Sequence, residues 1–428
     1  MDNAIGAWMP RVSAVLFSAG VFAMFPLPGH AQLAITGGQV ERVTDNANKT
    51  ATNENSDLES RTYVTASYVT DPGQCNAIFS GTLSYSIWQN NSFDNETSGN
   101  MNLNSECELA TGLFWDLDNN LREVSKDTTQ SDTPNNRTRK NIFSTGPRYI
   151  WRLGSRDSIA LNTRYETTKF EDPDETDSER YASSAAWSHL FSQTLTGGIS
   201  ASYTTTELDS GAKINVQTVR ATGSKNWATT SLSGAFGVSE IETDFGSTSQ
   251  TSDGFVGELN LTRALNPSTN WYLSAARELT DQTSSFDIRF EEFEFNLTES
   301  ISVQTTTVST GVNKRFSDQS SLTADVFANQ SDYLGTDELN ESVGLNIRYS
   351  RSFSESVSGN TMLGYRRSTF EPGDSDSQTL RLEIGLDYQA SRKLSLFGKL
   401  GHEQRTSSVS SREYDELWGL LGVEYKFR

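Results

Sequence analysis

The chain has 428 residues, of which only 35% are hydrophobic, and its formal net charge is −20. This acidic balance disfavours nucleic acid and anionic surfaces as partners, and the mean hydropathy of −0.54 argues against an ordinary globular protein. Aromatic residues at 10% and a sustained alternation of apolar and polar residues oppose intrinsic disorder, the other interpretation of such a composition.

The N-terminus has the features of an export signal. Arg11 precedes an apolar run from Val12 to Leu27, and the small residues Gly29 and Ala31 suit signal-peptidase cleavage after Ala31. We expect residues 1–31 to be a cleaved signal peptide, with an uncleaved membrane anchor as the alternative. No later segment approaches the roughly 20 apolar residues of a membrane helix, so the mature chain can cross a membrane only as strands.

The first part of the mature chain alternates weakly. Residues 32–58 are predicted to form a weak first strand, Leu33 to Thr44, followed by a polar loop. Further strands are expected at 59–70, 78–88, 101–106 and 109–121, the last two joined by a tight turn at Cys107. A long polar loop, Ser125 to Arg137, follows.

From Thr138 onward the chain reads as regular hairpins with short turns. Strands are predicted near 138–152, 157–170, 178–190, 194–207, 213–225, 228–243, 253–264, 270–283, 300–315, 320–332, 341–352 and 356–370. The connections between hairpins are longer and acidic, at Glu171–Glu179, Gln330–Glu341, Glu371–Asp376 and the long loop Ser284–Ser300.

The C-terminal hairpin shows the alternation most clearly. Leu380, Leu382, Ile384, Leu386 and Tyr388 share one face, and a turn at Ala390 leads to two more strands. The last strand ends in Tyr425 and Phe427, which fit the aromatic ending that barrel-assembly machinery recognises, although Arg428 follows them.

Short turns that alternate with long polar loops indicate an outer-membrane barrel, with the turns in the periplasm and the loops outside. The predicted fold is all-β: a transmembrane, antiparallel, up-and-down β-barrel of about 18–20 strands over residues 32–428. An open sheet edge cannot persist in hydrocarbon, so the last strand must pair with the first.

The two cysteines of the mature chain, Cys75 and Cys107, are placed at short periplasmic turns two strands apart. Export to an oxidising compartment permits a disulfide between them. The sequence does not give their distance, so the bond is a hypothesis that thiol labelling tests.

Charged residues of both signs fall on the predicted lumen face. They are Arg348, Arg366, Arg381, Glu383, Asp387 and Lys399. A barrel near twenty strands is too wide to be filled by its own side chains, so it is either open or plugged. The loops Ser125–Arg137 and Ser284–Ser300 are the candidates for constricting it.

Catalytic and metal sites find little support. His189 and His402 are the histidines of the mature chain, and no nucleophile motif accompanies them, so an outer-membrane hydrolase is a remote alternative. The acidic loop Glu171–Glu179 could bind Ca²⁺, but it lacks the spacing of a calcium loop and reads as a solvated loop. We predict no catalytic residue, metal or cofactor.

From Leu109 onward the chain resembles a family of outer-membrane β-barrel porins, the β-barrel porin 2 type. The residues that carry the resemblance are Leu113–Asn119, Asp132–Arg137, Asn141–Pro147, and Leu161–Phe170 with Arg180-Tyr181. These porins often accompany exopolysaccharide loci in Gram-negative bacteria, so the resemblance implies an outer-membrane location and a part in polysaccharide export.

The expected function is a porin-like channel for hydrophilic solutes. Its expected partners are outer-membrane lipid and lipopolysaccharide, the barrel-assembly machinery and polysaccharide export components, with no nucleic acid. A non-conducting envelope scaffold is the alternative from a different class.

Overall fold

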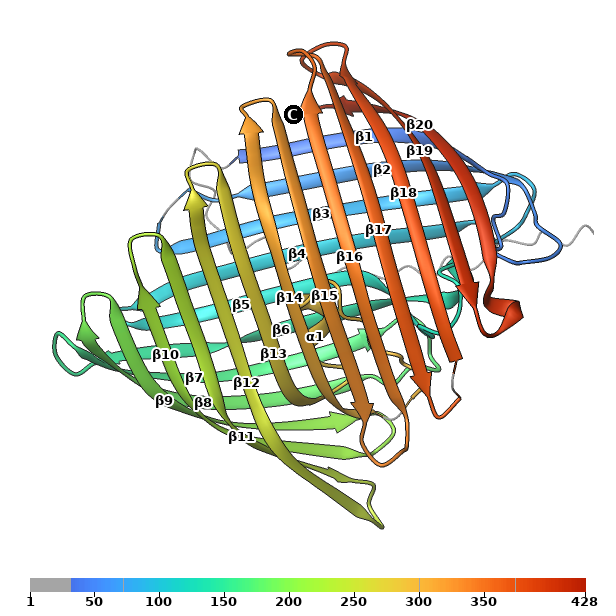
Figure 1. Cartoon of the computed structure of the whole chain (residues 1–428). Coiled ribbons are helices and arrows are strands. Elements are labelled where there is room, and N and C mark those ends of the chain that lie inside the picture. The colour runs from blue at the N-terminus through green and yellow to red at the C-terminus, as the bar shows by residue number, and fades with distance from the viewer. Residues whose placement is uncertain (1–31, 72, 300, 374) are drawn as a thin grey trace, which may run out of the picture.

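The computed structural model describes residues 32–428 except 72, 300 and 374; the expected signal peptide, residues 1–31, lies outside the described residues. Twenty antiparallel strands form one closed sheet (Figure 1). The strands are β1 (Gln32–Thr44), β2 (Asp57–Val69), β3 (Cys75–Trp88), β4 (Glu96–Ala110), β5 (Leu113–Ser125), β6 (Arg137–Arg152), β7 (Asp157–Phe170), β8 (Ser178–Ser192), β9 (Leu195–Leu208), β10 (Lys213–Asn226), β11 (Thr230–Asp244), β12 (Ser249–Asn266), β13 (Thr269–Asp281), β14 (Ser302–Ser317), β15 (Ser320–Tyr333), β16 (Leu339–Ser352), β17 (Val357–Glu371), β18 (Ser375–Gln389), β19 (Leu394–Ser407) and β20 (Tyr414–Lys426).

Helical structure is confined to short turns. One α-helical turn, α1 (Phe286–Arg289), lies between β13 and β14, and 3₁₀ turns occur at Pro134–Asn136 and Ser410–Arg412. Within the described part of the chain, no helix has the length and apolarity needed to cross a membrane.

The barrel closes where its first and last strands meet. β1 pairs with β20 from Thr36 opposite Lys426 to Thr44 opposite Trp418, and the Phe427 amide donates to the Ile35 carbonyl at 2.9 Å. The residues predicted as a weak first strand therefore form a full strand, because both of its edges have partners.

The two ends of the barrel differ. At one end, called the turn end here, connections such as 193–194 and 267–268 are two residues long, and both β1 and β20 reach this end. At the other end, called the loop end, three connections are long: 45–56, 126–136 and 282–301. This is the predicted asymmetry between short turns and long loops.

The outer face is apolar and carries aromatic residues at two levels. Near the turn end the exposed aromatic side chains include Trp151, Trp187, Phe191, Phe316, Phe353, Tyr388, Tyr425 and Phe427. Closer to the loop end they include Tyr85, Tyr181, Tyr203, Phe255 and Tyr365. Between the levels lie aliphatic residues such as Ile199 and Leu382. An apolar band between two aromatic girdles is the surface of a membrane-spanning barrel.

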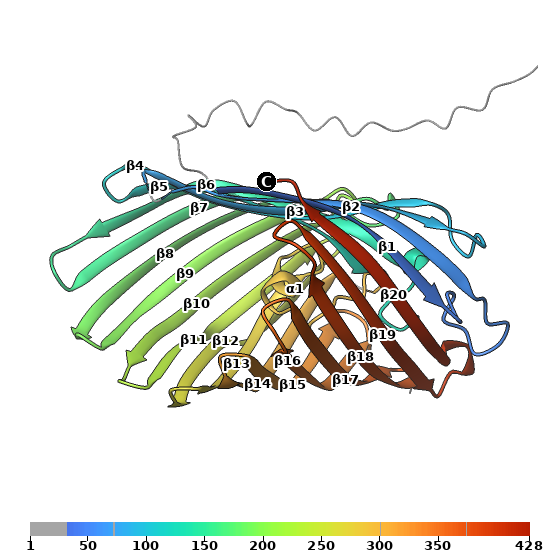
Figure 2. The same cartoon turned by 90° about the horizontal axis from the view of Figure 1, so that it is seen from above.

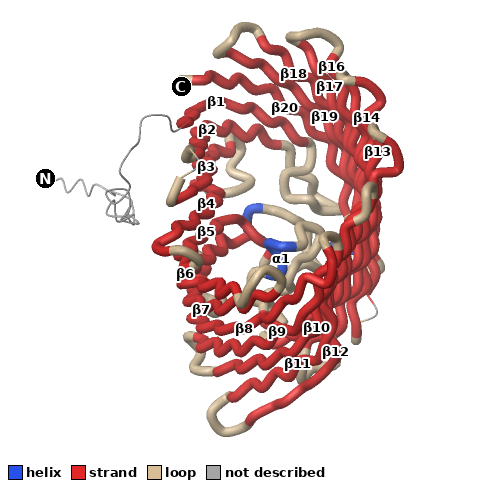
Figure 3. Tube along the Cα trace, turned by 90° about the vertical axis from the view of Figure 1, so that its left-hand side faces the viewer, coloured by secondary structure: helices blue, strands red, loops and turns tan. Residues whose placement is uncertain are grey.

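The barrel is flattened, and its lumen is partly occupied (Figure 2). Seen down the strands, α1 and several loops lie inside the ring of strands (Figure 3). On the narrow side, the lumen-facing Ile214, Ile241 and Val256 pack with Leu208 and Leu279 into an apolar cluster that fills the space between the walls.

Three local predictions were wrong. The turn expected at Cys107 lies at 111–112, because β4 continues through Cys107 to Ala110. Most of the predicted loops Gln330–Glu341 and Glu371–Asp376 is strand, since the β ladder continues past the apolar band. Polar residues there suit water-exposed strands as well as loops, so polarity alone could not separate the two.

Candidate functional site

Segment 282–301, called the plug here, runs from β13 into the lumen and back to β14. Its root is held by Lys140 of β6, whose ammonium donates to the carbonyls of Gln282 at 2.9 Å and Ser284 at 2.7 Å. The same ammonium lies 3.2 Å from the Asp287 carboxylate, which also pairs with Arg122 of β5. The side chains of Lys140 and Asp287 are 1% and 4% exposed, so this ion pair joins the plug to the opposite wall in a nearly dry site.

An aromatic cluster holds the middle of the plug. Phe286, Phe293 and Phe295 are buried and pack edge to face, at ring-centroid distances of 4.8 and 5.0 Å. They contact Val303 of β14 and Tyr333 of β15, whose hydroxyl accepts the Asn296 amide at 2.9 Å. Burial of several aromatic side chains makes this contact the main apolar anchor of the plug.

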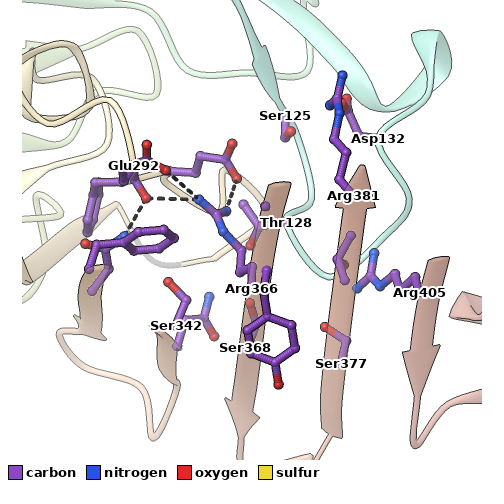
Figure 4. A pocket seen from close by; sticks show the side chains of 18 of the residues that line it. Ser125, Thr128, Asp132, Glu292, Ser342, Arg366, Ser368, Ser377, Arg381 and Arg405 are labelled. Carbon is purple, nitrogen blue, oxygen red and sulfur yellow. Dashed lines mark hydrogen bonds and ion pairs between the residues drawn. The ribbon is translucent and has the colours of Figure 1, made fainter. Parts of the chain in front are cut away.

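The acidic tip of the plug faces the wall of β15–β17. Glu294 lies 3.1 Å from Arg366 of β17, and Glu292 accepts a hydrogen bond from the amide of Asn346 at 3.0 Å (Figure 4). Arg366 and Glu294 are 32% and 47% exposed, so this contact is far wetter than the one at the root. An exposed ion pair contributes little stability, so the tip is attached more weakly than the root.

Two further loops enter the lumen beside the plug. Arg405 of β19 donates to the carbonyls of Thr129 and Gln130 in loop 126–136, both at 2.7 Å. The Leu297 amide of the plug donates to the Lys126 carbonyl at 2.9 Å. The two segments proposed from the sequence as constrictions therefore both lie in the lumen and contact each other.

Loop 45–56 completes the group. Lys49 places its ammonium 2.8 Å from Glu403 of β19 and over the ring of Tyr414. Its carbonyl accepts a hydrogen bond from Ser131 at 3.2 Å, so loop 45–56 is tied to loop 126–136. This role could not be predicted from the sequence, because the loop is polar and has no apolar anchor.

The predicted lumen residues all lie on the inner face. Arg381 pairs with Glu383 on its own strand and lies 3.7 Å from Glu403. Asp387 and Lys399 line a cavity of about 550 Å³ near the turn end. Arg348 of β16 shares the face of Asn346, and Arg366 contacts the plug as described. Strand alternation was sufficient to place these side chains.

Cavities lie on both sides of the plug. One of about 280 Å³ separates it from β15–β19, and one of about 370 Å³ separates it from β5. The charged residues that line the two are Glu123, Asp132, Asp287, Glu291, Glu292, Glu294, Glu341 and Glu403 against Arg122, Arg137, Arg366, Arg381 and Arg405. Acidic side chains outnumber basic ones, so the linings of these two cavities together carry a net negative charge.

The structure bonds Cys75 to Cys107, with 4.0 Å between their Cα atoms. The two residues are direct register partners on the neighbouring strands β3 and β4. The prediction placed both cysteines in turns on either side of two strands; they lie instead within those strands, because β3 begins at Cys75 and β4 continues through Cys107.

The remaining candidates lie away from the lumen. His189 contacts Asp157 and His402 contacts Asp415, each on the outer face of a different hairpin. In the acidic loop, Glu171 pairs with Arg139 and Asp172 with Lys126. Within the described residues, no group of three or more histidine, cysteine or acidic side chains is arranged to hold a metal ion.

Comparison with known families supports the resemblance. Residues 338–427 match the family described as "Putative beta-barrel porin 2". The match covers β16–β20, whereas the stretches that carry the resemblance in the sequence analysis, from Leu113 to Tyr181, lie outside it. No curated protein sequence matches the chain.

Solved structures share the barrel architecture at low identity. The siderophore receptor PirA from Pseudomonas aeruginosa is 12% identical, with 94% of this chain and 82% of that chain covered and a TM-score of 0.45. The FrpB iron transporter from Neisseria meningitidis (F3-3 variant) is 7% identical, with 92% of this chain and 81% of that chain covered and a TM-score of 0.48. A loop-deleted OmpT, an outer membrane protein of Vibrio cholerae, is 8% identical, with 93% of this chain and 99% of that chain covered and a TM-score of 0.38. At these scores nothing that those proteins bind is transferred to this chain.

Proposed function

We propose that the protein is a channel of the Gram-negative outer membrane that passes small hydrophilic solutes and prefers cations. Residues 1–31 serve as its cleaved signal peptide, and the chain acts as a transport protein rather than an enzyme. A link to exopolysaccharide export rests on the family resemblance alone.

The observation that carries this proposal is the excess of carboxylates in the cavities on the two sides of the plug. The barrel wall is closed, its outer face is apolar, and its lumen holds cavities with charged and hydroxyl-bearing linings on both sides of the plug. Excess carboxylates in a narrow aqueous path raise the local concentration of cations and lower that of anions.

The test is single-channel recording of the refolded mature protein in a planar bilayer under a salt gradient. We expect discrete steps and a reversal potential of the sign that cation preference gives. Replacing the two lumen carboxylates Glu291 and Glu294 by glutamine should reduce that potential.

A matched variant separates the lumen from the surface. Glu240 and Glu242 are exposed on the outer face of β11, so their replacement by glutamine changes the net charge equally and should leave selectivity unchanged. Stable insertion without current would overturn the proposal and favour the non-conducting scaffold, for which the interlocked loops at the loop end already give a structural reason.

A further inference from the structure

The barrel wall has a seam between β12 and β13. Their pairing ends at Gly257 opposite Arg277, whereas β12 stays paired with β11 as far as Ser249 opposite Asp244. Among the described residues, the β13-facing side of Ser249–Val256 therefore has no strand partner. We call this eight-residue stretch the free edge; it runs from the loop end down to the level of the exposed girdle residue Phe255.

Beyond Arg277, β13 parts from β12 and leans into the lumen, while its ladder with β14 continues to Asp281 opposite Ser302. Asp281 pairs with Arg180 of β8 at 2.8 Å, and the Thr283 carbonyl accepts a hydrogen bond from Thr168 of β7 at 2.8 Å. The hydroxyl of Ser178 donates to that of Thr283 at 2.8 Å. The segment missing from the seam is thus the segment that carries the root of the plug.

The register of the β12–β13 ladder determines which residues would pair with the free edge. Continuing it one residue at a time from Gly257 and Arg277 places Val256 opposite Glu278 and Ser249 opposite Ser285. Antiparallel partners share a face, so Phe255 and Leu279 would meet on the outer face. Residues 278–285 therefore match the free edge in length, and the apolar Leu279 would meet the apolar Phe255.

We propose that the plug has a second position, in which residues 278–285 pair with the free edge and draw the plug out of the lumen. We call this pairing zipping. This inference rests on the proposed channel function and supplies its gate. In one position the segment is held by contacts with β7 and β8 across the lumen, and in the other it would pair with the free edge, which gives a discrete two-state element.

Charge decides which position prevails. In the structure Asp281 is 2% exposed and paired with Arg180, which also lies 3.4 Å from Glu166. After zipping, Asp281 would lie opposite Asp253, and like charges in directly opposed positions are unfavourable. The free edge itself costs little, because its position at the loop end leaves its backbone groups accessible to water. The plugged position is thus favoured and Arg180–Asp281 acts as its lock.

Variants of Asp281 and Arg180 test this lock, because we expect them to change open-channel time by different amounts. Asp281→Asn weakens the lock and removes the repulsion after zipping, so we expect a several-fold increase in open-channel time. Arg180→Ala removes the lock but keeps the repulsion, so its effect should be smaller. Asp244→Asn, at an exposed position on the outer face of β11, is the matched control and should change nothing.

Disulfide trapping tests the second position directly, in a background with Cys75 and Cys107 replaced by alanine. Ser249→Cys with Ser285→Cys should cross-link under copper–phenanthroline oxidation if zipping occurs, raise conductance several-fold, and lose both effects on reduction. Ser178→Cys with Thr283→Cys should cross-link in the plugged position and hold conductance at its lowest level.

The outcomes separate the gate from the channel. Cross-linking of the second pair without any of the first, in protein that conducts, would overturn zipping and leave the channel intact. Cross-linking of the first pair without current in any variant would support zipping and overturn the channel function. Mass spectrometry of the tryptic fragments identifies which pair has formed.

Discussion

Lys140 and Asp287 meet inside the barrel, 3.2 Å apart, although one belongs to the wall and the other to the plug. The ammonium is also bound by two plug carbonyls, so a single side chain holds three points of the plug root. Buried ion pairs are costly to leave half made, and this contact therefore stabilises the attachment of the plug root alongside Arg180–Asp281.

Replacing Lys140 by methionine should loosen the plug root. Asp287 keeps Arg122 as a partner, so we expect a loss of about 2 kcal/mol of plug attachment, below the full cost of an unpaired buried charge. Trypsin should then cleave after Arg289 in the folded barrel, and conductance should rise. Lys213→Met removes an exposed ion pair with Glu207 on the outer face and is the control. Equal protease resistance in both variants would contradict the assignment of Lys140.

The end of the plug that leads into β14, where Glu299 lies, should respond to pH. Burial, followed by the hydrogen bond and the negative charge of Glu338, raises the pKa of Glu299 from 4.5 to about 7, with a smaller effect from Asp127. Because the folded-state pKa is raised, the contribution of the protonated pair is complete below pH 4.5 and is lost as pH rises through 7.

We therefore expect the plug to be held more weakly at pH 8 than at pH 5, by about 1 kcal/mol after discounting for solvent screening. Open-channel time measured across this range should rise accordingly. Glu299→Gln keeps a hydrogen-bonding side chain without the charge and should flatten the profile. Glu175 in loop 171–177 has a pKa raised to about 7 by burial and by Asp172, so Glu175→Gln controls for a general effect. A profile that stays steep in Glu299→Gln would show that another group titrates.

The architecture could be predicted from the sequence, because each strand is specified by its own residues. Residues such as Leu382 and Glu383 alternate between lipid and lumen, and this alternation fixes a strand and its two faces without any knowledge of neighbours. The turn at 111–112 was placed too early, at Cys107, although Leu103, Cys107 and Leu109 keep one alternation that indicates a single strand as far as Ala110.

The site could be predicted less well, because it depends on contacts between distant segments. The length of loop 284–300 suggested a constriction, and Phe286, Phe293 and Phe295 in a polar loop were a signal that it packs against something. Nothing in the sequence pairs Lys140 with Asp287, 147 residues apart. The seam between β12 and β13 was invisible for the same reason, since both strands alternate normally on each side of Gly257.

The disulfide predicts a specific labelling result. Non-reduced, denatured mature protein should take up no maleimide, and reduced protein should take up two equivalents. Replacing both Cys75 and Cys107 by alanine should lower stability by about 2–4 kcal/mol, the usual effect of closing a loop of this length. Two reactive thiols in native protein would sink the assignment.

A glycine beneath an aromatic ring should prove essential to the closing hairpin. A Cβ at Gly401 of β19 would overlap the indole of Trp418 on β20, a side chain that is 7% exposed. Gly401→Ala must displace this ring, and such overpacking costs about 1–3 kcal/mol. Gly223 of β10 is also a strand glycine, but its nearest contact for a Cβ is 3.9 Å, so Gly223→Ala should be nearly neutral. Urea unfolding in detergent, followed by the gel shift of the folded barrel, measures both. Equal midpoints would show that β20 can move its tryptophan freely, and that the pairing which closes the barrel tolerates more change than its packing indicates.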